Sequence, residues 1–318
     1  MSLHLYTYGS YAIGTHVVFP ELHPARDVSP SVFFRVRQKP GRVAAPVRRV
    51  REWRTKDGEV LAALHEAADS YVIHFMRLAR FQVSRDCSMV RCTPFRSCSP
   101  ALMRHLFLDQ IMPLLLSLTG EYVMHASAVE HEGRAIAFVG DSGAGKSTMA
   151  ATFGRAAGRI LADDSVMVRE TAGQFLVSAP YASLRLWEDS AAALRLGRGQ
   201  AAHRNGKRRF LRSSQVSFAA GPLPLDAICV LDRTDARDGA AALCRMSAAD
   251  ALVMLVKSTF KFDISQRSFL EREFRFLSHL VASVPCYRLT VPDSLDELPS
   301  LRQFVIDAVD GGRTRRTA

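Results

Sequence analysis

Residues 121–168 read EYVMHASAVEHEGRAIAFVGDSGAGKSTMAATFGRAAGRILADDSVMV, and this stretch decides the fold of the chain. The apolar run at residues 134–139 is typical of a short buried strand, and the alanine-rich run at 148–157 is typical of a helix. Between them, residues 140–147 read GDSGAGKS and fit the pattern G-x-x-x-x-G-K-S. Because this glycine-rich segment lies between a strand and a helix, the sequence predicts one continuous strand–loop–helix unit.

Residues 140–148 have the composition of a phosphate-binding loop. Glycines let backbone N–H groups converge on phosphate oxygens, and the N-terminus of the following helix favours an anion. We expect Lys146 to reach the β- and γ-phosphates of a nucleotide and the Ser147 hydroxyl to bind Mg²⁺. A glycine-rich turn that matches the pattern by chance is the alternative. The predicted nucleotide-binding residues are Gly140, Asp141, Ser142, Gly143, Ala144, Gly145, Lys146, Ser147 and Thr148.

Two adjacent carboxylates, Asp163 and Asp164, follow the short apolar run at residues 159–162. Strand tips face the ligand crevice in open α/β sheets, so we expect this pair beside the loop. One carboxylate can bind Mg²⁺, and the other can accept a proton from an attacking hydroxyl. Neighbouring side chains on a strand point to opposite faces, so the two should differ in role unless the strand has ended. A solvated turn is the alternative for the pair taken alone.

These features resemble the catalytic domain of HPr kinase/phosphorylase and its wider group of kinase homologues, whose fold is similar to that of the ATP-dependent phosphoenolpyruvate carboxykinases. The resemblance rests on His125, on GDSGAGKS and on LADDSV at residues 161–166. It implies a P-loop catalytic domain of this type, and the β-forming residues before that domain predict a smaller, mostly β domain, so the expected fold class is mixed α/β (α+β). It also implies that Asp163 is the general base, that Asp164 and Ser147 bind the metal, and that His125 lies near the transferred phosphate.

The sequence departs from the bifunctional family after the Asp pair. That family has a Glu-x-Arg-Gly-containing signature, whereas here Ser183 replaces the Glu, Arg185 is kept and the Gly is missing. This departure argues against phosphorolysis and against HPr as the substrate, and it leaves open whether phosphorolysis also occurs. The chain is more similar to divergent relatives, some of which accompany peptide-modification genes, including lasso-peptide pathways, and phosphorylate a peptide hydroxyl. Without the resemblance, His125 is equally consistent with a hydrogen-bonded core histidine.

The resemblance implies an ATP- and Mg²⁺-dependent kinase that transfers the γ-phosphate to a Ser/Thr-type hydroxyl of a peptide or protein. A ribosomal precursor peptide of the lasso type is one candidate substrate. A small-molecule kinase would use the same residues, and so would a P-loop ATPase or nucleotide switch that has no hydroxyl acceptor. Homo-oligomerisation is left open, because members of the bifunctional family form hexamers but the N-terminal half of this chain differs from theirs.

Two segments rich in basic residues match no known functional motif. Residues 197–212 are the densest basic run and are predicted to be a mobile loop. Lys207 and Arg209 are the side chains in it that we expect to neutralise charge on the transferring phosphoryl group, and a solvated surface loop is the alternative. Residues 39–54 are predicted to be a solvated loop, with substrate contact as the alternative.

The composition limits the class of protein. A net charge of +11 favours an acidic substrate or a polyanionic ligand, and we do not expect nucleic acid because no zinc finger or groove-reading basic helix is present. The six cysteines include no C-x-x-C pair, which is typical of reduced thiols in a cytoplasmic protein. The N-terminus lacks the pattern of a signal peptide. The apolar run at residues 111–118 is too short to span a membrane and contains Pro113, so no membrane association is expected.

The pattern of β-forming, helical and turn residues predicts two domains joined by a helix. In the first of them, residues 89–92 are the expected hairpin partner of residues 81–84. Pro113 is expected to kink the joining helix. The predicted organisation is a mostly β N-terminal domain at residues 1–98, a connecting helix at 99–120, the catalytic domain at 121–310 and a basic disordered tail at 311–318.

Overall fold

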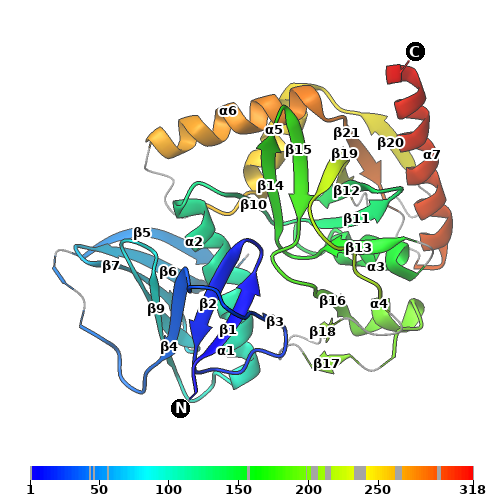
Figure 1. Ribbon diagram of the computed structural model, residues 1–318. Coiled ribbons are helices and arrows are strands. Elements are labelled where there is room, and N and C mark those ends of the chain that lie inside the picture. The colour runs from blue at the N-terminus through cyan, green and yellow to red at the C-terminus, as the bar shows by residue number, and fades with distance from the viewer. Residues whose placement is uncertain are drawn as a thin grey trace. The chain divides into compact units, whose positions relative to one another are not determined.

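The chain is a mixed α/β protein with several sheets, divided into two compact units (Figure 1). Unit 1 comprises Met1–Gly120 and Lys261–Arg267, and unit 2 comprises Glu121–Phe260 and Ser268–Ala318. The computed structural model describes residues 2–42, 44–45, 47–55, 57–155, 158–197, 199–201, 207–211, 216–232, 241–261, 267–291 and 295–317.

Unit 1 is built on a nine-stranded sheet with the order β3-β1-β2-β4-β9-β8-β7-β6-β5. The predicted hairpin is confirmed, because β8 and β9 pair antiparallel with Phe81 opposite Cys92. The strands are β1 (His4–Tyr8), β2 (Tyr11–Thr15), β3 (His23–Pro24), β4 (Val32–Val36), β5 (Val47–Arg54), β6 (Val60–Ala67), β7 (Ser70–Phe75), β8 (Ala79–Ser84) and β9 (Met89–Pro94).

The predicted loop at residues 39–54 is wrong for its second half, because β5 is an edge strand paired with β6. Ion pairs stabilise it: Arg48 lies 2.6 Å from Glu66 on the neighbouring strand, and Arg49 lies 2.8 Å from Glu52. Cross-strand charge pairs support a strand, and charged side chains are common on sheet edges. β5 contains four arginines, so its sequence lacks the alternation of apolar and polar residues by which a strand is usually predicted.

The helical segment at residues 100–118 belongs to unit 1. It consists of α1 (Pro100–Leu106), the π-helical turn η1 (Phe107–Ile111) and α2 (Met112–Leu118). The Ser99 side chain caps α1 by accepting a hydrogen bond from the Leu102 N–H. Pro113 has no N–H to donate, and the π turn lies directly before it, with the Met112 N–H bonded to the Phe107 carbonyl. The proline is therefore accommodated by a change in helix type.

Among the described residues, Pro100–Leu118 is the one segment that is long and apolar enough to cross a membrane by length and composition. Its mean hydropathy is 1.2, and 78% of it is buried inside the protein. Phe107 stacks on Phe34 of β4 with ring centroids 4.1 Å apart. Such burial is typical of a core helix.

Unit 2 contains a mixed sheet in which β12 is central. The strand order is β10-β14-β15-β19-β12-β11-β13, with β21 paired to β19 and β20 paired to β21. The β12–β19 and β19–β21 pairs are parallel, and the other pairs are antiparallel. The strands are β10 (Tyr122–Met124), β11 (Ser127–His131), β12 (Arg134–Val139), β13 (Arg159–Ala162), β14 (Val166–Thr171), β15 (Gln174–Ser178), β19 (Leu223–Asp232), β20 (Ala242–Arg245) and β21 (Cys286–Thr290).

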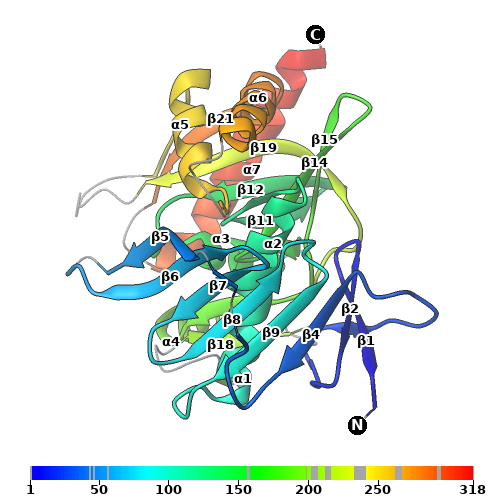
Figure 2. The same cartoon turned by 90° about the vertical axis from the view of Figure 1, so that its left-hand side faces the viewer.

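Helices cover both faces of this sheet (Figure 2). Alternate residues of β12 serve two separate cores: Ile136 and Phe138 pack with α3 and α7, whereas Ala137 and Val139 pack with α5 and α6. The apolar run that predicts this strand is continuous because both of its faces are buried. The helices are α3 (Lys146–Arg155), α4 (Glu188–Ala193), α5 (Ala248–Ser258), α6 (Arg267–Ser283), the 3₁₀ turn η2 (Leu295–Glu297) and α7 (Leu298–Thr317).

Helix α7 runs to Thr317, so the predicted disordered tail is wrong for residues 311–317, which are helical. Leu301, Val305 and Val309 recur at helical spacing and are buried in the core that includes α3. This apolar stripe anchors the earlier turns of α7, and the basic residues continue the same helix. The prediction of a disordered tail, which was based on polar composition alone, is therefore wrong for these residues.

Gly154 of α3 is a position where the packing of helix on sheet can be tested. A Cβ added there would lie 2.7 Å from Cγ1 of the buried Ile160, whereas a Cβ at Gly311 of α7 would meet nothing within 4 Å. We expect Gly154→Ala to lower the free energy of unfolding by about 1–3 kcal/mol, because the core is overpacked. Gly311→Ala should be neutral or stabilising by at most about 1 kcal/mol, because alanine favours the helix. Urea denaturation of both variants measures the difference, and equal stabilities would contradict this packing.

Candidate functional site

The loop between β12 and α3 has a backbone that requires glycine. β12 ends at Val139, as predicted, and α3 spans Lys146–Arg155, two residues earlier than the predicted helix at 148–157. Gly140 has a φ of +146°, and a Cβ there would lie 2.9 Å from the Leu231 carbonyl oxygen of β19. Gly145 has a φ of +100° directly before the helix. Left-handed backbone and close approach to a neighbouring strand both exclude larger residues, so the loop is positioned tightly against the sheet.

A cavity of about 400 Å³ in unit 2 opens over this loop. Its size is in the range of sites for small ligands. Of the predicted site residues, it is lined by Ser142 to Thr148, and also by His125, Asp164, Arg185 and Lys207. The remaining lining residues are Met149, Leu186, Trp187, Asp189, Ser190, Val291, Leu295 and Leu298.

Lys146 is held at the loop by two hydrogen bonds. Its Nζ donates to the carbonyl oxygens of Gly140 at 2.9 Å and Asp141 at 3.0 Å. Burial lowers the pKa of Lys146, and the charges of Asp164 and Asp163 oppose that shift. The ammonium group is therefore held at the loop backbone, close to two carboxylates.

Asp163 joins three parts of unit 2. Its Oδ1 accepts hydrogen bonds from the hydroxyls of Ser127 at 2.6 Å and Ser147 at 2.8 Å, and its Oδ2 accepts from the Arg185 backbone N–H at 2.8 Å. Burial and the neighbouring Asp164 raise its pKa to about 6, and these hydrogen bonds act in the opposite direction. Asp163 is not among the residues that line the cavity. Because Asp163 accepts the hydrogen bond of the Ser147 hydroxyl from outside the cavity, its role in this structure is to orient Ser147.

Asp164 does face the cavity, because the strand has ended before it. β13 ends at Ala162, and Asp164 has a left-handed backbone with a φ of +63°. Its Oδ2 lies 2.8 Å from a terminal guanidinium nitrogen of Arg185. The turn after the strand thus places the two neighbouring carboxylates in different environments: Asp164 faces the cavity, and Asp163 does not.

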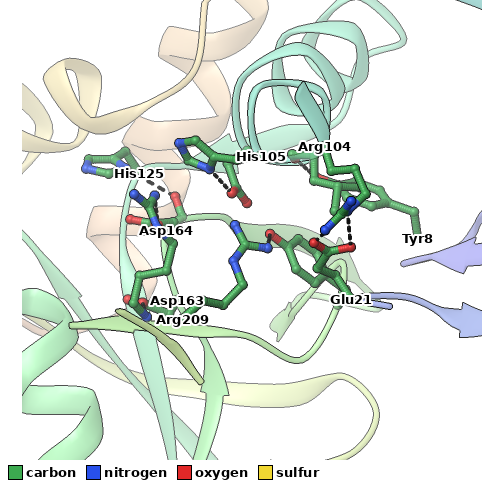
Figure 3. Close-up of polar contacts among 12 residues, drawn as sticks. Tyr8, Glu21, Arg104, His105, His125, Asp163, Asp164 and Arg209 are labelled. Atoms are coloured by element: carbon green, nitrogen blue, oxygen red, sulfur yellow. Dashed lines mark hydrogen bonds and ion pairs between the residues drawn. The ribbon is translucent and has the colours of Figure 1, made fainter. Parts of the chain in front are cut away.

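His125 is hydrogen-bonded and also lines the cavity. Its side chain is partly buried, and its Nδ1 lies 3.2 Å from the Asp164 carbonyl oxygen (Figure 3). Its backbone N–H donates to the Ser258 carbonyl oxygen. Burial lowers the pKa of His125, and the charge of Asp164 opposes this shift. The neutral imidazole is therefore favoured beside Asp164.

A small sheet carries the basic residues. It comprises β16 (Leu184–Trp187), β18 (Lys207–Phe210) and β17 (Gln200–Ala201), in the order β16-β18-β17. Of the predicted mobile loop at residues 197–212, the parts at 200–201 and 207–210 are strands, and residues 198, 202–206 and 212 lie outside the described residues. The antiparallel register places Arg185 opposite Arg209 and Trp187 opposite Lys207. These four side chains share one face of the small sheet.

Of the two basic side chains predicted for catalysis, Lys207 lines the cavity and Arg209 does not. Lys207 lines the cavity, and its Nζ lies 5.4 Å from the Trp187 ring centroid. Arg209 is buried at 5% exposure, bonds the Tyr181 hydroxyl at 3.2 Å and is not a lining residue. Arg209 therefore supports the small sheet beneath the site, and its guanidinium is used in that packing.

Several residues of the site had no signal in the sequence analysis. Ser127 lies two positions after His125, and its contact with Asp163 depends on the β11–β13 pairing. Leu295 and Leu298 come from the C-terminal part of the chain and follow no motif. Only packing of the sheets and helices brings these residues together.

The oxygen donors near the loop fit a magnesium ion. The Ser147 hydroxyl and the Asp164 carboxylate, which line the cavity, are hard oxygen ligands of the kind that Mg²⁺ prefers. These ligands include neither a sulfur atom nor an imidazole nitrogen, the donors that softer metals prefer. A separate group, His131, Glu132 and Asp310, has ligand atoms within 4.8 Å of one another away from the loop.

No protein-family model matches the sequence, and no curated protein matches it. Among solved structures, the HPr(Ser) kinase/phosphatase from Coxiella burnetii is similar to this chain at 9% sequence identity. The alignment covers 62% of this chain and 99% of that chain, with a TM-score of 0.33. Similarity at this level supports no statement about function.

The left-handed turn at Asp164 gives a stability prediction. Asp164→Asn and Asp164→Ala both remove the ion pair with Arg185, but asparagine tolerates a left-handed backbone and alanine does not. We therefore expect the alanine variant to be less stable than the asparagine variant by about 1 kcal/mol. Urea denaturation of the two proteins measures the difference. An alanine variant as stable as the asparagine variant would show that residue 164 is not held in this conformation.

Proposed function

We propose that unit 2 is an ATP- and Mg²⁺-dependent kinase that transfers the γ-phosphate to a hydroxyl group. The observation that carries this proposal is a cavity lined by the phosphate-binding loop, by the Asp164 carboxylate and by the cationic side chains of Lys146, Arg185 and Lys207. The loop and the N-terminus of α3 suit the phosphates of a nucleotide. Asp164, Arg185, Lys207 and His125 also line this cavity, in which an acceptor hydroxyl can approach the terminal phosphate.

The two carboxylates take opposite roles from those that the family resemblance implies. Asp164 lines the cavity and is the group that accepts the proton of the acceptor hydroxyl. Asp163 is buried behind Ser147 and holds that hydroxyl in place for the metal. Magnesium, when bound, supplies positive charge to the phosphate oxygens. His125 contacts the Asp164 backbone and thereby helps to fix the turn that aims the carboxylate.

The remaining residues stabilise negative charge. Lys146 lies at the loop, Lys207 reaches the cavity from β18, and Arg185 is paired with Asp164. Phosphoryl transfer needs little covalent chemistry from a protein, so catalysis here consists of positioning and electrostatic stabilisation. These cations and the helix N-terminus provide that stabilisation at the place where charge develops.

We propose a Ser/Thr-type hydroxyl of an acidic peptide or protein as the acceptor. The net charge of +11 attracts an acidic partner. In unit 1, the arginine-rich edge strand β5 offers a surface of the same sign, and sheet edges bind extended peptides. A small-molecule acceptor, or water alone, would use the same cavity, and these are separate outcomes of the transfer assay.

The first functional prediction concerns phosphate transfer. With γ-labelled ATP, Mg²⁺ and a pool of acidic Ser/Thr peptides, we expect label on a peptide hydroxyl. Lys146→Ala and Asp164→Asn should each lower kcat/KM by at least about a hundredfold, because each removes a charge from the reacting centre. Lys257→Ala, at an exposed lysine of α5, is the matched control and should retain activity.

Other outcomes of this assay identify the alternatives. Steady release of labelled phosphate without any acceptor would indicate an ATPase. ATP binding without transfer to peptides would indicate a small-molecule kinase. Full transfer by Asp164→Asn, with loss in Asp163→Asn, would restore Asp163 as the base. Absence of ATP binding would exclude the proposed function.

The second functional prediction concerns Ser127, which positions Asp163. Removing its hydroxyl takes one of two donors from Asp163 Oδ1 and loosens the Ser147 contact. We expect Ser127→Ala to lower kcat roughly tenfold or more, since a hydrogen bond to a charged group is lost. Ser165→Ala is the matched control, because Ser165 is also a buried serine but its Oγ has no hydrogen-bond partner among the described residues. Steady-state kinetics of both variants measures the effect, and equal kcat values would contradict the positioning role.

A further inference from the structure

A histidine and two carboxylates converge in unit 2, away from the phosphate-binding loop. His131 ends β11, Glu132 follows it in the turn to β12, and Asp310 lies near the end of α7. One ligand atom of each residue lies within 4.8 Å of the other two. Among the residues that the structure describes, this is the one group of three His, Cys, Asp or Glu side chains that meets this condition. It joins two segments that are 179 residues apart.

The distance between His131 and Asp310 suits two ligands of one metal ion. The imidazole Nε2 lies 3.4 Å from a carboxylate oxygen of Asp310. A hydrogen bond from a ring nitrogen to an oxygen is usually about 2.7–3.2 Å long, so this separation is long for a direct contact. Zinc–nitrogen and zinc–oxygen bonds of about 2.0–2.2 Å at tetrahedral angles place neighbouring ligand atoms about 3.3–3.5 Å apart.

The other histidine–carboxylate pairs in the described part of the chain give a comparison. Both are shorter, and neither belongs to a group of three ligand atoms within 4.8 Å of one another. They are His105 with Asp109 at 2.5 Å and His279 with Glu170 at 3.1 Å. The pair at His131 therefore differs from them both in its wider spacing and in its second carboxylate.

The turn that carries two of the three ligands is fixed by its own contacts. His131 is paired with Arg134 across the hairpin, and its side chain is only 15% exposed. The Gly133 N–H donates to the Glu130 carboxylate at 2.8 Å. Arg159 of β13 donates to the same carboxylate at 3.1 Å. The position of the imidazole is thus set before any ion binds, which lowers the cost of binding.

We propose that His131, Glu132 and Asp310 bind a divalent transition-metal ion, for which Zn²⁺ is the probe. Imidazole nitrogen and carboxylate oxygen are both ligands that Zn²⁺ accepts, whereas Mg²⁺ prefers oxygen ligands and should bind here more weakly. Glu132 is exposed, so its side chain can rotate to bring the carboxylate to bonding distance. Three protein ligands leave a position for water. This inference is independent of the proposed function.

The ion has a structural role, because it joins the β11–β12 turn to the end of α7. Helix α7 packs in the same core as α3, the helix that follows the phosphate-binding loop. The unfolded chain does not hold the three ligands together, so the ion binds the folded state and stabilises it. Removal of the metal should therefore lower the thermal stability of the protein.

Calorimetry on the metal-free full chain measures the Kd of Zn²⁺, with excess Mg²⁺ present to compete for the oxygen ligands of the cavity. In His131→Ala, Glu132→Gln and Asp310→Asn, we expect this Kd to rise at least about tenfold, because a metal ligand is lost or weakened. His279→Ala is the matched control, because it removes the histidine of a pair with a single carboxylate. Its Kd should stay within about twofold of the wild type.

Two further readouts report on coordination and on stability. Co²⁺ absorbs visible light strongly when few ligands surround it, and this absorption should be present in the wild type and in His279→Ala but absent from His131→Ala. At a free Zn²⁺ concentration of about a hundred times Kd, the Tm of the wild type should rise by about 5 °C or more. The Tm of His131→Ala should rise by less than half as much. Circular dichroism checks that each variant is folded.

The possible results decide the proposal. An unchanged Kd of Zn²⁺ in folded His131→Ala and Asp310→Asn would overturn the site. A rise of the Kd in His279→Ala as large as in His131→Ala would also overturn it, because Zn²⁺ would then bind at surface histidines in general. Equal affinities of the wild type for Mg²⁺ and Zn²⁺ would overturn the assignment of a transition metal. None of these results depends on phosphate transfer, which has its own assay.

Discussion

The structure of the site depends on one buried carboxylate. Asp163 accepts hydrogen bonds from Ser127 of β11, from Ser147 at the start of α3 and from the backbone of Arg185 in β16. Three segments that are distant in the sequence are thereby fixed to one side chain. A buried carboxylate is costly unless it is well hydrogen-bonded, so the network stabilises both the group and the segments that satisfy it.

The same network explains why two adjacent aspartates differ. The strand ends at Ala162, and the left-handed backbone of Asp164 turns the second carboxylate toward the cavity, where Arg185 pairs with it. Arg185 therefore contacts both carboxylates, one through its backbone N–H and one through its guanidinium. Arg185 of β16 thus links Asp163, the buried carboxylate that orients Ser147, to Asp164, the carboxylate that faces the cavity.

Several expectations failed because they relied on composition. Arginine-rich segments were predicted as loops, yet residues 47–54 form β5 and residues 207–210 form β18. In both strands, partners across the sheet supply what the local sequence lacks: Glu66 faces Arg48, and Trp187 faces Lys207. Local β propensity is weak in such segments, and cross-strand contacts that a single sequence does not contain decide their structure.

The sequence by itself determined the strand–loop–helix unit at residues 134–155, because its glycines, its lysine and its apolar strand act locally. It also determined that two carboxylates follow the next strand, and three of the residues that it singled out, His125, Arg185 and Lys207, line the cavity. Only the tertiary structure decided which carboxylate faces that cavity, that Arg209 lies outside its lining, and that Ser127, Trp187 and Leu295 belong to the site. These features depend on sheet register and on packing between distant elements, and such contacts have no fixed spacing along the chain.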